Sequence, residues 1–191
     1  MAIRKILTEP NKILREKSLR IENVDKDIQQ LMDDMLETLY AAPGIGLAAI
    51  QVGIAKRVIV MDMSRSRNDI GRDKDDINKN EDKESKKPMY FVNPEIVWKS
   101  EDQSIYEEGC LSVPNQIAEI YRPKKCHIKY LDYDGNPKEI KVEGLMATCM
   151  QHEIDHLEGI LFIDYLSKLK KSMIIKKLSK QKKETIDRIV I

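Results

Sequence analysis

After Asp25, apolar residues recur every three or four positions, and this spacing predicts a helix with one apolar face. Asp25 stands where a side-chain oxygen can cap the first turn. The helix is expected to end at Ala42-Pro43, because proline disfavours helical backbone in the residue before it. We therefore expect this helix to pack on the core through Ile28, Leu31, Met32, Met35, Leu36, Leu39 and Tyr40.

Two apolar runs, over residues 57–63 and 90–97, predict buried strands. Between them, residues 64–88 are almost all charged or polar, with Ile70 and Ile77 the only large aliphatic side chains. A segment of this composition buries too little apolar surface to offset the entropy lost on ordering. We therefore expect a charged, mobile loop over residues 64–88.

Further along, residues 125–133 and 138–142 alternate around Asp134-Gly135-Asn136-Pro137, which predicts a β-hairpin. A helix that is apolar on nearly every face should follow it, and such a helix lies inside a protein. Gly159 stands where a left-handed residue would end that helix. Its apolar residues are Leu145, Met146, Cys149, Met150, Ile154 and Leu157.

This buried helix carries a candidate metal site. His152 and His156 are four residues apart, so their side chains share one helix face and can bind one divalent metal. Glu153 can reach a metal-bound water without being a ligand itself. The alternative is two ordinary histidines that happen to be spaced by four. The metal is favoured because two of only three histidines in the chain fall around this glutamate.

A third ligand must come from elsewhere in the chain. Cys110 is the leading candidate, because a thiolate binds divalent first-row metals strongly. The alternative for Cys110 is a small buried hydrophobic residue. Cys149 would share a helix face with His152 and stays open as a ligand. Cys126 and His127 are neighbours in a predicted strand, so they point to opposite faces and cannot both serve one site.

The stretch from Gly44 to Gln51 holds two glycines one residue apart, which allow a peptide or ligand backbone to approach closely. A tight turn is the alternative interpretation. The stretch is not a dinucleotide fingerprint, because position 49 is alanine and no strand precedes it. Gln51 is the one polar side chain with a long reach in this segment.

The composition of the 191 residues suits one soluble domain, with 41% hydrophobic residues and a net charge of +1. No apolar run approaches the length of a membrane span, and the N-terminus lacks a secretory signal core, so we expect no membrane contact. Three cysteines, an odd and small number, favour free thiols and a cytoplasmic location.

The last helix is strongly basic, with no acidic residue from Ser167 until Glu184. A polyanionic partner such as RNA is one hypothesis, and a solubilising helix face is the other. The helix should pack through an apolar stripe of Leu166, Leu169, Met173, Ile174 and Leu178. Its lysines are Lys168, Lys170, Lys171, Lys176, Lys177, Lys180, Lys182 and Lys183.

Three stretches stand in a fixed order: Gly44-Ile45-Gly46-Leu47-Ala48-Ala49-Ile50-Gln51, Glu108-Gly109-Cys110-Leu111-Ser112 and Gln151-His152-Glu153-Ile154-Asp155-His156. Together they resemble the three signature motifs of the peptide deformylases, and the resemblance covers nearly the whole chain. It implies an α+β fold in which antiparallel β-sheets surround a buried metal-binding helix, with a basic C-terminal helix. We expect a catalytic domain over residues 1–166, extended by a basic helix over residues 167–191.

The resemblance also implies a hydrolase that removes the N-terminal formyl group from the formyl-methionine of new polypeptides, by attack of a metal-bound hydroxide on the formyl carbon. By match, Cys110, His152 and His156 hold the metal and Glu153 is the general acid and base. The family's metal is Fe²⁺, which Zn²⁺, Ni²⁺ or Co²⁺ can replace. The basic helix is implied to dock on the ribosome. The charged loop departs from the family pattern, which puts partner contacts in doubt but not the chemistry.

For the substrate, an N-formylmethionyl peptide, Gln51 and the backbone N–H of Leu111 are implied to stabilise the oxyanion. Gly44 and Gly46 would let the peptide lie alongside as an added strand. Further contacts, mainly with the methionine side chain, are expected from Ile45, Tyr106, Gly109, Leu111, Leu145 and Cys149.

Two other functions stay open from the residues alone. A zinc endopeptidase would need a downstream histidine or glutamate as third ligand, but no histidine follows His156 and Glu158 is too near along the helix. An RNA-binding module with a closed structural metal would need a fourth protein ligand and would show no catalysis.

Overall fold

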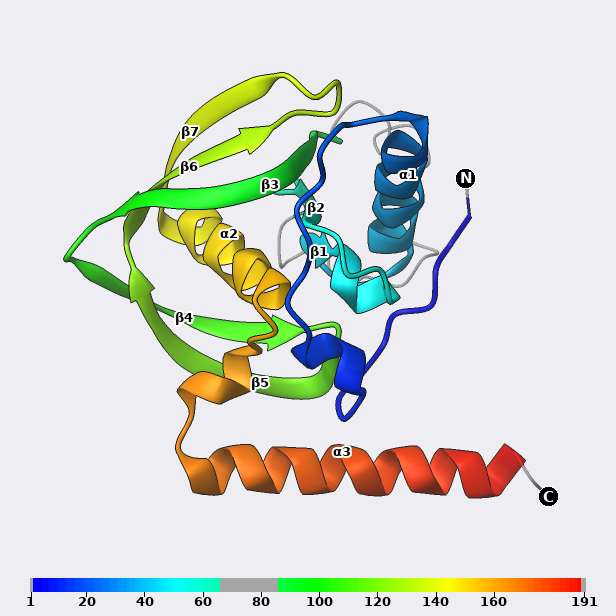
Figure 1. Cartoon of the computed structure of the whole chain (residues 1–191). Coiled ribbons are helices and arrows are strands. Elements are labelled where there is room, and N and C mark those ends of the chain that lie inside the picture. Colours follow the sequence, from blue (N-terminus) through cyan, green and yellow to red (C-terminus); the bar gives the residue numbers. More distant parts are fainter. Residues whose placement is uncertain (1, 66–85, 190–191) are drawn as a thin grey trace.

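The computed structural model describes residues 2–65 and 86–189, with side chains described as far as Gln181. Helix α2 (Gly144–Leu157) lies between two antiparallel sheets, as Figure 1 shows. The predicted α+β class is therefore confirmed. The predicted loop over residues 64–88 falls mostly on residues 66–85, which lie outside the described residues.

In the part of the chain that the structure describes, seven strands form the two sheets: β1 (Gly46–Ala48), β2 (Val58–Asp62), β3 (Pro88–Lys99), β4 (Gln103–Cys110), β5 (Val113–Pro123), β6 (Lys125–Leu131) and β7 (Pro137–Glu143). The larger sheet has the order β1-β2-β3-β6-β7, and β4 pairs with β5 in the smaller one. All neighbours are antiparallel. The predicted strands appear as β2, β3 and the β6–β7 hairpin, where Gly135 turns the chain with a φ of 82°.

Helix α1 (Lys26–Ala41) begins and ends where the apolar spacing predicted. The carboxylate of Asp25 accepts a hydrogen bond from the backbone N–H of Ile28 at 2.9 Å and so caps the first turn. The apolar face of α1 packs against β2 and β3, with Met32, Met35 and Leu39 fully buried. This packing forms one of the two cores of the large sheet.

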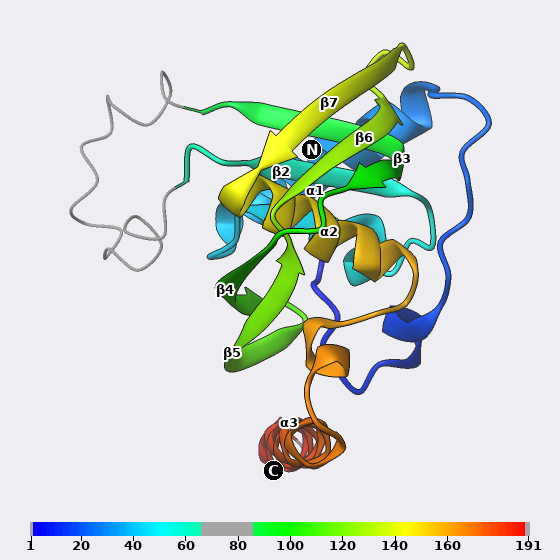
Figure 2. The ribbon, with the colours of Figure 1, turned by 90° about the vertical axis from the view of Figure 1, so that its left-hand side faces the viewer.

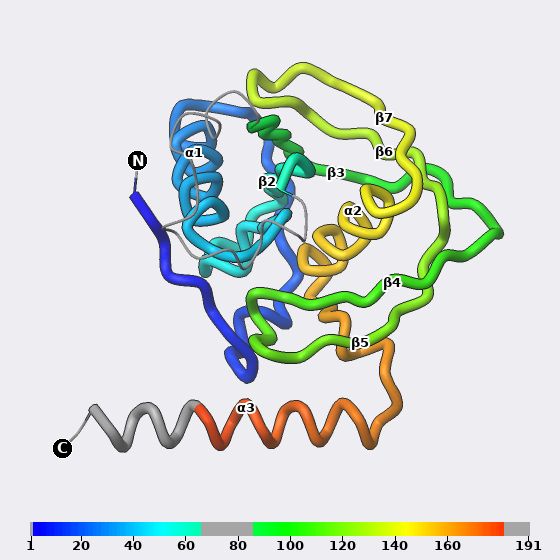
Figure 3. The backbone as a smooth tube through the Cα atoms, turned by 180° about the vertical axis from the view of Figure 1, so that it is seen from behind, coloured from blue at the N-terminus to red at the C-terminus, as the bar shows by residue number. Residues whose placement is uncertain are grey.

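Helix α2 is buried from both sides, as predicted from the apolar residues on nearly all of its faces (Figure 3). Met150, Ile154 and Leu157 pack against the large sheet, and the opposite face of α2 lies towards the β4–β5 hairpin. Gly159 follows the helix with a φ of 74°, which is the left-handed end expected from the sequence. The histidine-bearing helix is therefore an interior element.

The β4–β5 hairpin has no counterpart among the predicted elements. The side chains of β4 and β5 point alternately to the two faces of the hairpin, but each face carries both polar and apolar residues. Glu108 and Arg122 are buried on the inner face, while Ile105 and Tyr121 are exposed on the outer face. Because each face carries both charged and apolar side chains, with Ile120 inside and Glu107 and Glu119 outside, the hydrophobic pattern does not reveal these strands.

Helix α3 (Lys168–Ile189) lies beyond the smaller sheet and is seen end-on in Figure 2. The predicted apolar stripe is wrong for Leu169 and Met173, which are 72% and 62% exposed. The stripe is confirmed for Leu166, Ile174 and Leu178, which pack against the protein together with Ile175. The described residues also form three short 3₁₀ helices: η1 (Lys12–Arg15), η2 (Ala49–Val52) and η3 (Phe162–Tyr165). None of the described helices is long and apolar enough to span a bilayer.

The close approach of Gly159 to the N-terminal segment gives a testable stability prediction. A Cβ at Gly159 would lie 2.5 Å from the backbone oxygen of Arg15, whereas one at Gly53 would meet only Leu7 Cδ1, at 3.5 Å. Both glycines have positive φ, so Gly53→Ala should cost about 1–2 kcal/mol of unfolding free energy from backbone strain alone. Gly159→Ala should cost roughly 1–3 kcal/mol more because of the clash. Urea unfolding of both variants measures the difference, and equal losses would contradict this packing.

Candidate active site

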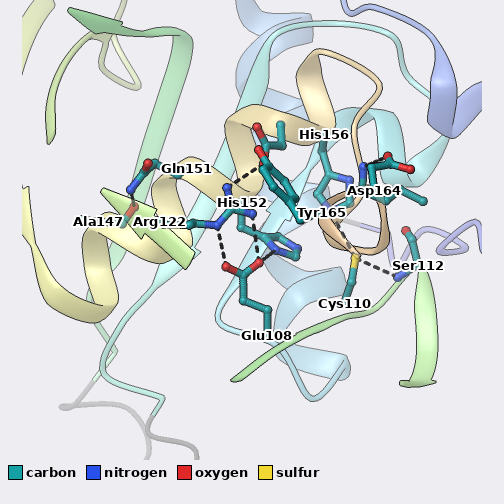
Figure 4. A network of polar contacts seen from close by, with 12 residues as sticks. Glu108, Cys110, Ser112, Arg122, Ala147, Gln151, His152, His156, Asp164 and Tyr165 are labelled. Carbon is teal, nitrogen blue, oxygen red and sulfur yellow. Dashed lines mark hydrogen bonds and ion pairs between the residues drawn. The ribbon is translucent and has the colours of Figure 1, made fainter. Parts of the chain in front are cut away.

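Three side chains from two elements converge at the face of α2 that meets the hairpin (Figure 4). Cys110 is the last residue of β4, and His152 and His156 lie one turn apart on α2. The Sγ of Cys110 lies 3.1 Å from the Nε2 of His156. One candidate ligand atom from each residue lies within 4.8 Å of the other two. The sulfur and the two imidazoles therefore face a common point.

The other candidate ligands lie apart from this cluster. Cys126 is buried in the core beneath the large sheet. His127 packs against Trp98, with tilted rings whose centroids are 4.6 Å apart. Cys149 lines the cavity beside the site but is not part of the cluster. Of the candidates for a third ligand, the fold brings Cys110 to the two histidines.

Glu108 fixes the orientation of His152. The Nδ1 of His152 lies 2.8 Å from a carboxylate oxygen of Glu108, which leaves Nε2 as the nitrogen available to a ligand. Arg122 donates to both oxygens of Glu108, at 2.5 and 3.0 Å, and to Asp155 at 2.7 Å. Burial raises the pKa of Glu108, but the hydrogen bonds from His152 and Arg122 outweigh it and lower that pKa. Glu108 is therefore a buried, ionised partner of the imidazole.

Glu108 and Arg122 are site residues that the sequence reasoning missed. A signal for Glu108 was available, because it precedes Cys110 by two residues and so shares its strand face. A histidine that binds a metal usually donates its second N–H to a carboxylate or carbonyl. Arg122 carries no local signal, since it reaches Glu108 only through the pairing of β4 with β5.

Glu153 lies on α2 beside His152 and is buried. Burial raises the pKa of Glu153 to about 7. Among the described residues, no group forms a hydrogen bond with its Oε2. A Cβ at Gly46 would lie 2.6 Å from Oε1 of Glu153, so only glycine leaves room for the carboxyl group in this position. The site therefore holds a buried carboxyl group that can exchange a proton near neutral pH.

Gln51 presents its amide to the same point. Its Oε1 accepts a hydrogen bond from the backbone N–H of Ala48 at 2.8 Å. Its Nε2 donates to the Ser112 hydroxyl at 3.1 Å and lies 3.6 Å from the Cys110 sulfur. The backbone N–H of Ser112 lies 3.4 Å from the same sulfur. Two N–H groups, from Gln51 and Ser112, therefore point to the Cys110 sulfur.

A cavity of about 790 Å³ opens beside these groups, a size typical of small-ligand sites. Tyr106, expected to contact the substrate, is not part of the lining, and its hydroxyl lies near Gly144 instead. A Cβ at Gly44 would lie 2.9 Å from the Leu111 side chain, so the backbone at Gly44 and the Leu111 side chain lie close together where both line the cavity. The other predicted residues that line the cavity are Gly44, Ile45, Gly46, Gln51, Gly109, Cys110, Leu111, Leu145, Cys149, His152 and Glu153.

The cluster of Cys110, His152 and His156 fits a divalent metal. Tetrahedral coordination with bond lengths of roughly 2.0–2.3 Å separates ligand atoms by about 3.5 Å, which is compatible with atoms that all lie within 4.8 Å of one another. Burial lowers the pKa of His156, and a neutral imidazole is the form that binds a metal. One sulfur and two nitrogens are donors that suit first-row divalent ions.

The model of the polypeptide deformylase family matches residues 3–172. The chain belongs to the peptide deformylase family. The peptide deformylase of Pelagibacter ubique is 59% identical over 186 residues, covering 97% of this chain and 99% of that protein. The solved peptide deformylase of Ehrlichia chaffeensis in complex with actinonin has a TM-score of 0.82 at 41% identity, covering 95% of this chain and 98% of that one. The solved peptide deformylase of Legionella pneumophila has a TM-score of 0.81 at 40% sequence identity, and the match covers 97% of this chain and 98% of that one.

Membership confirms the activity expected from the three motifs. The chain is a metal-dependent hydrolase that removes the N-terminal formyl group from the formyl-methionine of new polypeptides. The alternatives of an endopeptidase and of a non-catalytic RNA-binding module are not supported by any of these matches.

The contact between Glu108 and His152 predicts a change in metal affinity. Glu108→Gln keeps the shape of the side chain but removes the charge that orients His152, so metal affinity should fall roughly 10- to 100-fold. Competition with a chelator of known affinity measures the change. Glu119→Gln, on the exposed face of the same hairpin, is the matched control. Equal affinity in the two variants would mean that Glu108 does not tune the site.

Proposed function

We propose that Cys110, His152 and His156 hold the catalytic metal of this deformylase and that an N-formylmethionyl peptide binds in the adjoining cavity. The observation that carries the proposal is the convergence of one sulfur and two imidazoles within 4.8 Å beside the cavity. One coordination position is then left open, as catalysis requires. Cys149 lines the cavity and is proposed as a substrate contact, not a ligand.

The metal we propose is Fe²⁺, which Zn²⁺, Ni²⁺ or Co²⁺ can replace. The thiolate and imidazole donors support a first-row divalent ion over Mg²⁺ or Ca²⁺, which prefer oxygen ligands. When bound, the metal supplies a Lewis acid that lowers the pKa of a coordinated water and polarises the formyl oxygen. Glu108 and Arg122 hold His152 in the orientation that this site needs.

Glu153 is proposed as the general base and acid. It accepts a proton from the attacking water and later delivers a proton to the departing amine. A pKa of about 7 suits both steps, because the carboxyl group can then bind and release a proton at neutral pH. Gly46 supports the role by leaving space for the carboxyl group.

The amide of Gln51 and the backbone N–H of Leu111 are proposed to stabilise the tetrahedral oxyanion. Preorganised donors of this kind act strongly because they need no reorientation during the reaction. The Gln51 amide is held by Ala48 on one side and Ser112 on the other, so its N–H groups are fixed before substrate binds. Removing a donor of this type typically costs about 100- to 1000-fold in kcat.

The substrate is proposed to lie between β1 and the β4–β5 turn. Ile45, Leu145 and Cys149 offer an apolar pocket for the methionine side chain. The backbone of Gly44, Gly46 and Gly109 lines the path of the peptide. The approach of Gly44 to Leu111 narrows the cavity, which favours a formyl group over bulkier acyl groups. Tyr106 is left out of this pocket because it does not line the cavity.

Residues 1–166 are proposed to carry the chemistry and residues 167–191 to extend the domain as a basic helix that docks on ribosomal RNA. Lysines on an exposed helix face attract a phosphate backbone. The support is the exposure of Lys168, Lys170, Lys176, Lys177 and Lys180 on α3. A cytoplasmic location is proposed because the three cysteines are free thiols.

The role of Glu153 is tested by Glu153→Ala. The variant should bind one metal per chain like the wild type, because Glu153 is not a ligand. Its kcat for formate release should fall by about 100- to 10,000-fold, since general acid–base catalysis contributes this much. Glu139→Ala, on exposed β7, is the control for loss of a carboxylate. Near-normal turnover by Glu153→Ala would show that another group is the base.

The ligand set is tested by three cysteine variants. Cys110→Ala should lose the metal, as measured by elemental analysis after gel filtration. Cys149→Ala and Cys126→Ala should retain one metal per chain, because neither residue belongs to the cluster. Full occupancy in Cys110→Ala would move the sulfur ligand to one of the other cysteines.

A further inference from the structure

Arg65 follows strand β2 and reaches back to the end of helix α1. Its Nη1 donates to the backbone oxygens of Leu39 and Gly44, at 2.6 and 3.0 Å, and its Nη2 donates to that of Tyr40 at 3.4 Å. The last carbonyls of a helix have no partner within the helix, and a cation there also meets the negative end of the helix dipole. The last turn of α1 itself carries no basic residue. Arg65 therefore caps α1 from outside the helix.

Two further contacts fix the position of Arg65. Its guanidinium carbon lies 5.5 Å from the centroid of the Tyr40 ring, which is a cation–π contact. The Tyr40 hydroxyl donates to the carboxylate of Asp62 at 2.7 Å. Asp62 ends β2, is fully buried and also accepts from the backbone N–H of Ser64 at 2.9 Å. The ring beneath the guanidinium is therefore tied to the strand that Arg65 follows.

The link between α1 and β1 forms one side of the substrate cavity. Every residue from 41 to 46 lines the cavity, and this segment is called here the cavity wall. At the β1 end, the backbone N–H of Asp62 donates to the Ile45 carbonyl at 2.9 Å. At the α1 end, Arg65 joins the last turn of the helix to the Gly44 carbonyl. Arg65 is not among the described residues that line the cavity, so it acts on the cavity wall from outside.

The Gly44 carbonyl is the point at which this cap reaches the substrate site. The peptide bond between Gly44 and Ile45 is trans and planar, so a carbonyl held by Arg65 turns the N–H of Ile45 the opposite way. A Cβ at Gly44 would lie 2.9 Å from the Leu111 side chain, so a shift of this backbone also moves the space left to Leu111. The contact with Arg65 therefore sets both the orientation of the cavity wall and the width of the cavity beside it.

We propose, resting on the function proposed above, that Arg65 is a positioning residue for deformylation and holds the cavity wall in the conformation that binds the N-formylmethionyl peptide. Without its guanidinium, the Gly44 carbonyl is no longer joined to α1, and the cavity wall populates conformations that do not bind the peptide. Affinity then falls by the fraction of molecules that keep the binding conformation. None of the described contacts of Arg65 reaches the metal cluster, so the chemical step is unchanged.

Kinetics with formyl-Met-Ala test this role through the split between KM and kcat. Arg65→Met keeps an unbranched side chain but removes the N–H donors. The KM should rise roughly tenfold, which corresponds to about one molecule in ten with the cavity wall in the binding conformation. The kcat and the metal content per chain should stay at the wild-type level, because an interaction equally strong in ground and transition states affects KM alone.

Arg4→Met is the matched control, because Arg4 also supports α1 but at another place. Its guanidinium donates to the Asp34 carboxylate at 2.9 and 3.3 Å, and neither residue is among the described residues that line the cavity. Arg4→Met should therefore keep the wild-type KM even where it lowers the stability to urea. An equal rise of KM in Arg4→Met and Arg65→Met would show that KM follows the stability of α1, and would overturn the proposal.

Arg65→Lys keeps the charge but not the planar fork of donors, so it tests the geometry of the contact. Its KM should lie between those of the wild type and Arg65→Met, and it decides alone if Arg65→Met does not fold. A wild-type KM in every folded Arg65 variant overturns the proposal. Absence of formate release from formyl-Met-Ala by the wild-type protein would instead overturn the proposed function, and this inference with it.

Discussion

The buried ion pair of Glu108 and Arg122 ties the β4–β5 hairpin to helix α2, because Glu108 also contacts His152 and Arg122 also donates to Asp155, and the geometry of the site depends on these contacts. Two charges taken out of water cost several kcal/mol unless their hydrogen bonds are complete. Here all three guanidinium nitrogens of Arg122 donate, two to Glu108 and one to Asp155. Asp155 also accepts from the Tyr165 hydroxyl at 2.8 Å. This network satisfies the charges in the strand register that also brings Cys110 to His156.

The same network explains why the hairpin is hard to predict. A strand is recognised from sequence when its apolar residues face the core. In β4 and β5 the inner face holds a glutamate and an arginine, while isoleucines and a tyrosine face solvent. By contrast, α1, β2 and the β6–β7 hairpin follow the ordinary pattern, and their positions were predicted within a few residues. The error in α3 has a related cause, because Leu169 and Met173 are apolar yet point outward.

Much of the site was accessible to sequence reasoning because its chemistry is local. The four-residue spacing of His152 and His156, with Glu153 between them, predicts a metal-binding helix face with a carboxyl group beside it. The choice of Cys110 over Cys149 could not be made from spacing alone, since it depends on how β4 approaches α2. The positions of Gly44 and Gly46 show a similar limit. Their spacing predicts room for a peptide, but the two glycines also make room for Leu111 and Glu153.

The central claim, that one metal held by Cys110, His152 and His156 carries the deformylation, is tested most directly by titrating the metal-free protein with Fe²⁺ without oxygen. Formate release from a formyl-methionyl peptide should rise in proportion to added metal and stop rising at one Fe²⁺ per chain. The three candidate ligands lie within 4.8 Å of one another, an arrangement that fits one metal per chain. Formate release that is independent of added metal, or that saturates only at two metals per chain, would contradict this account.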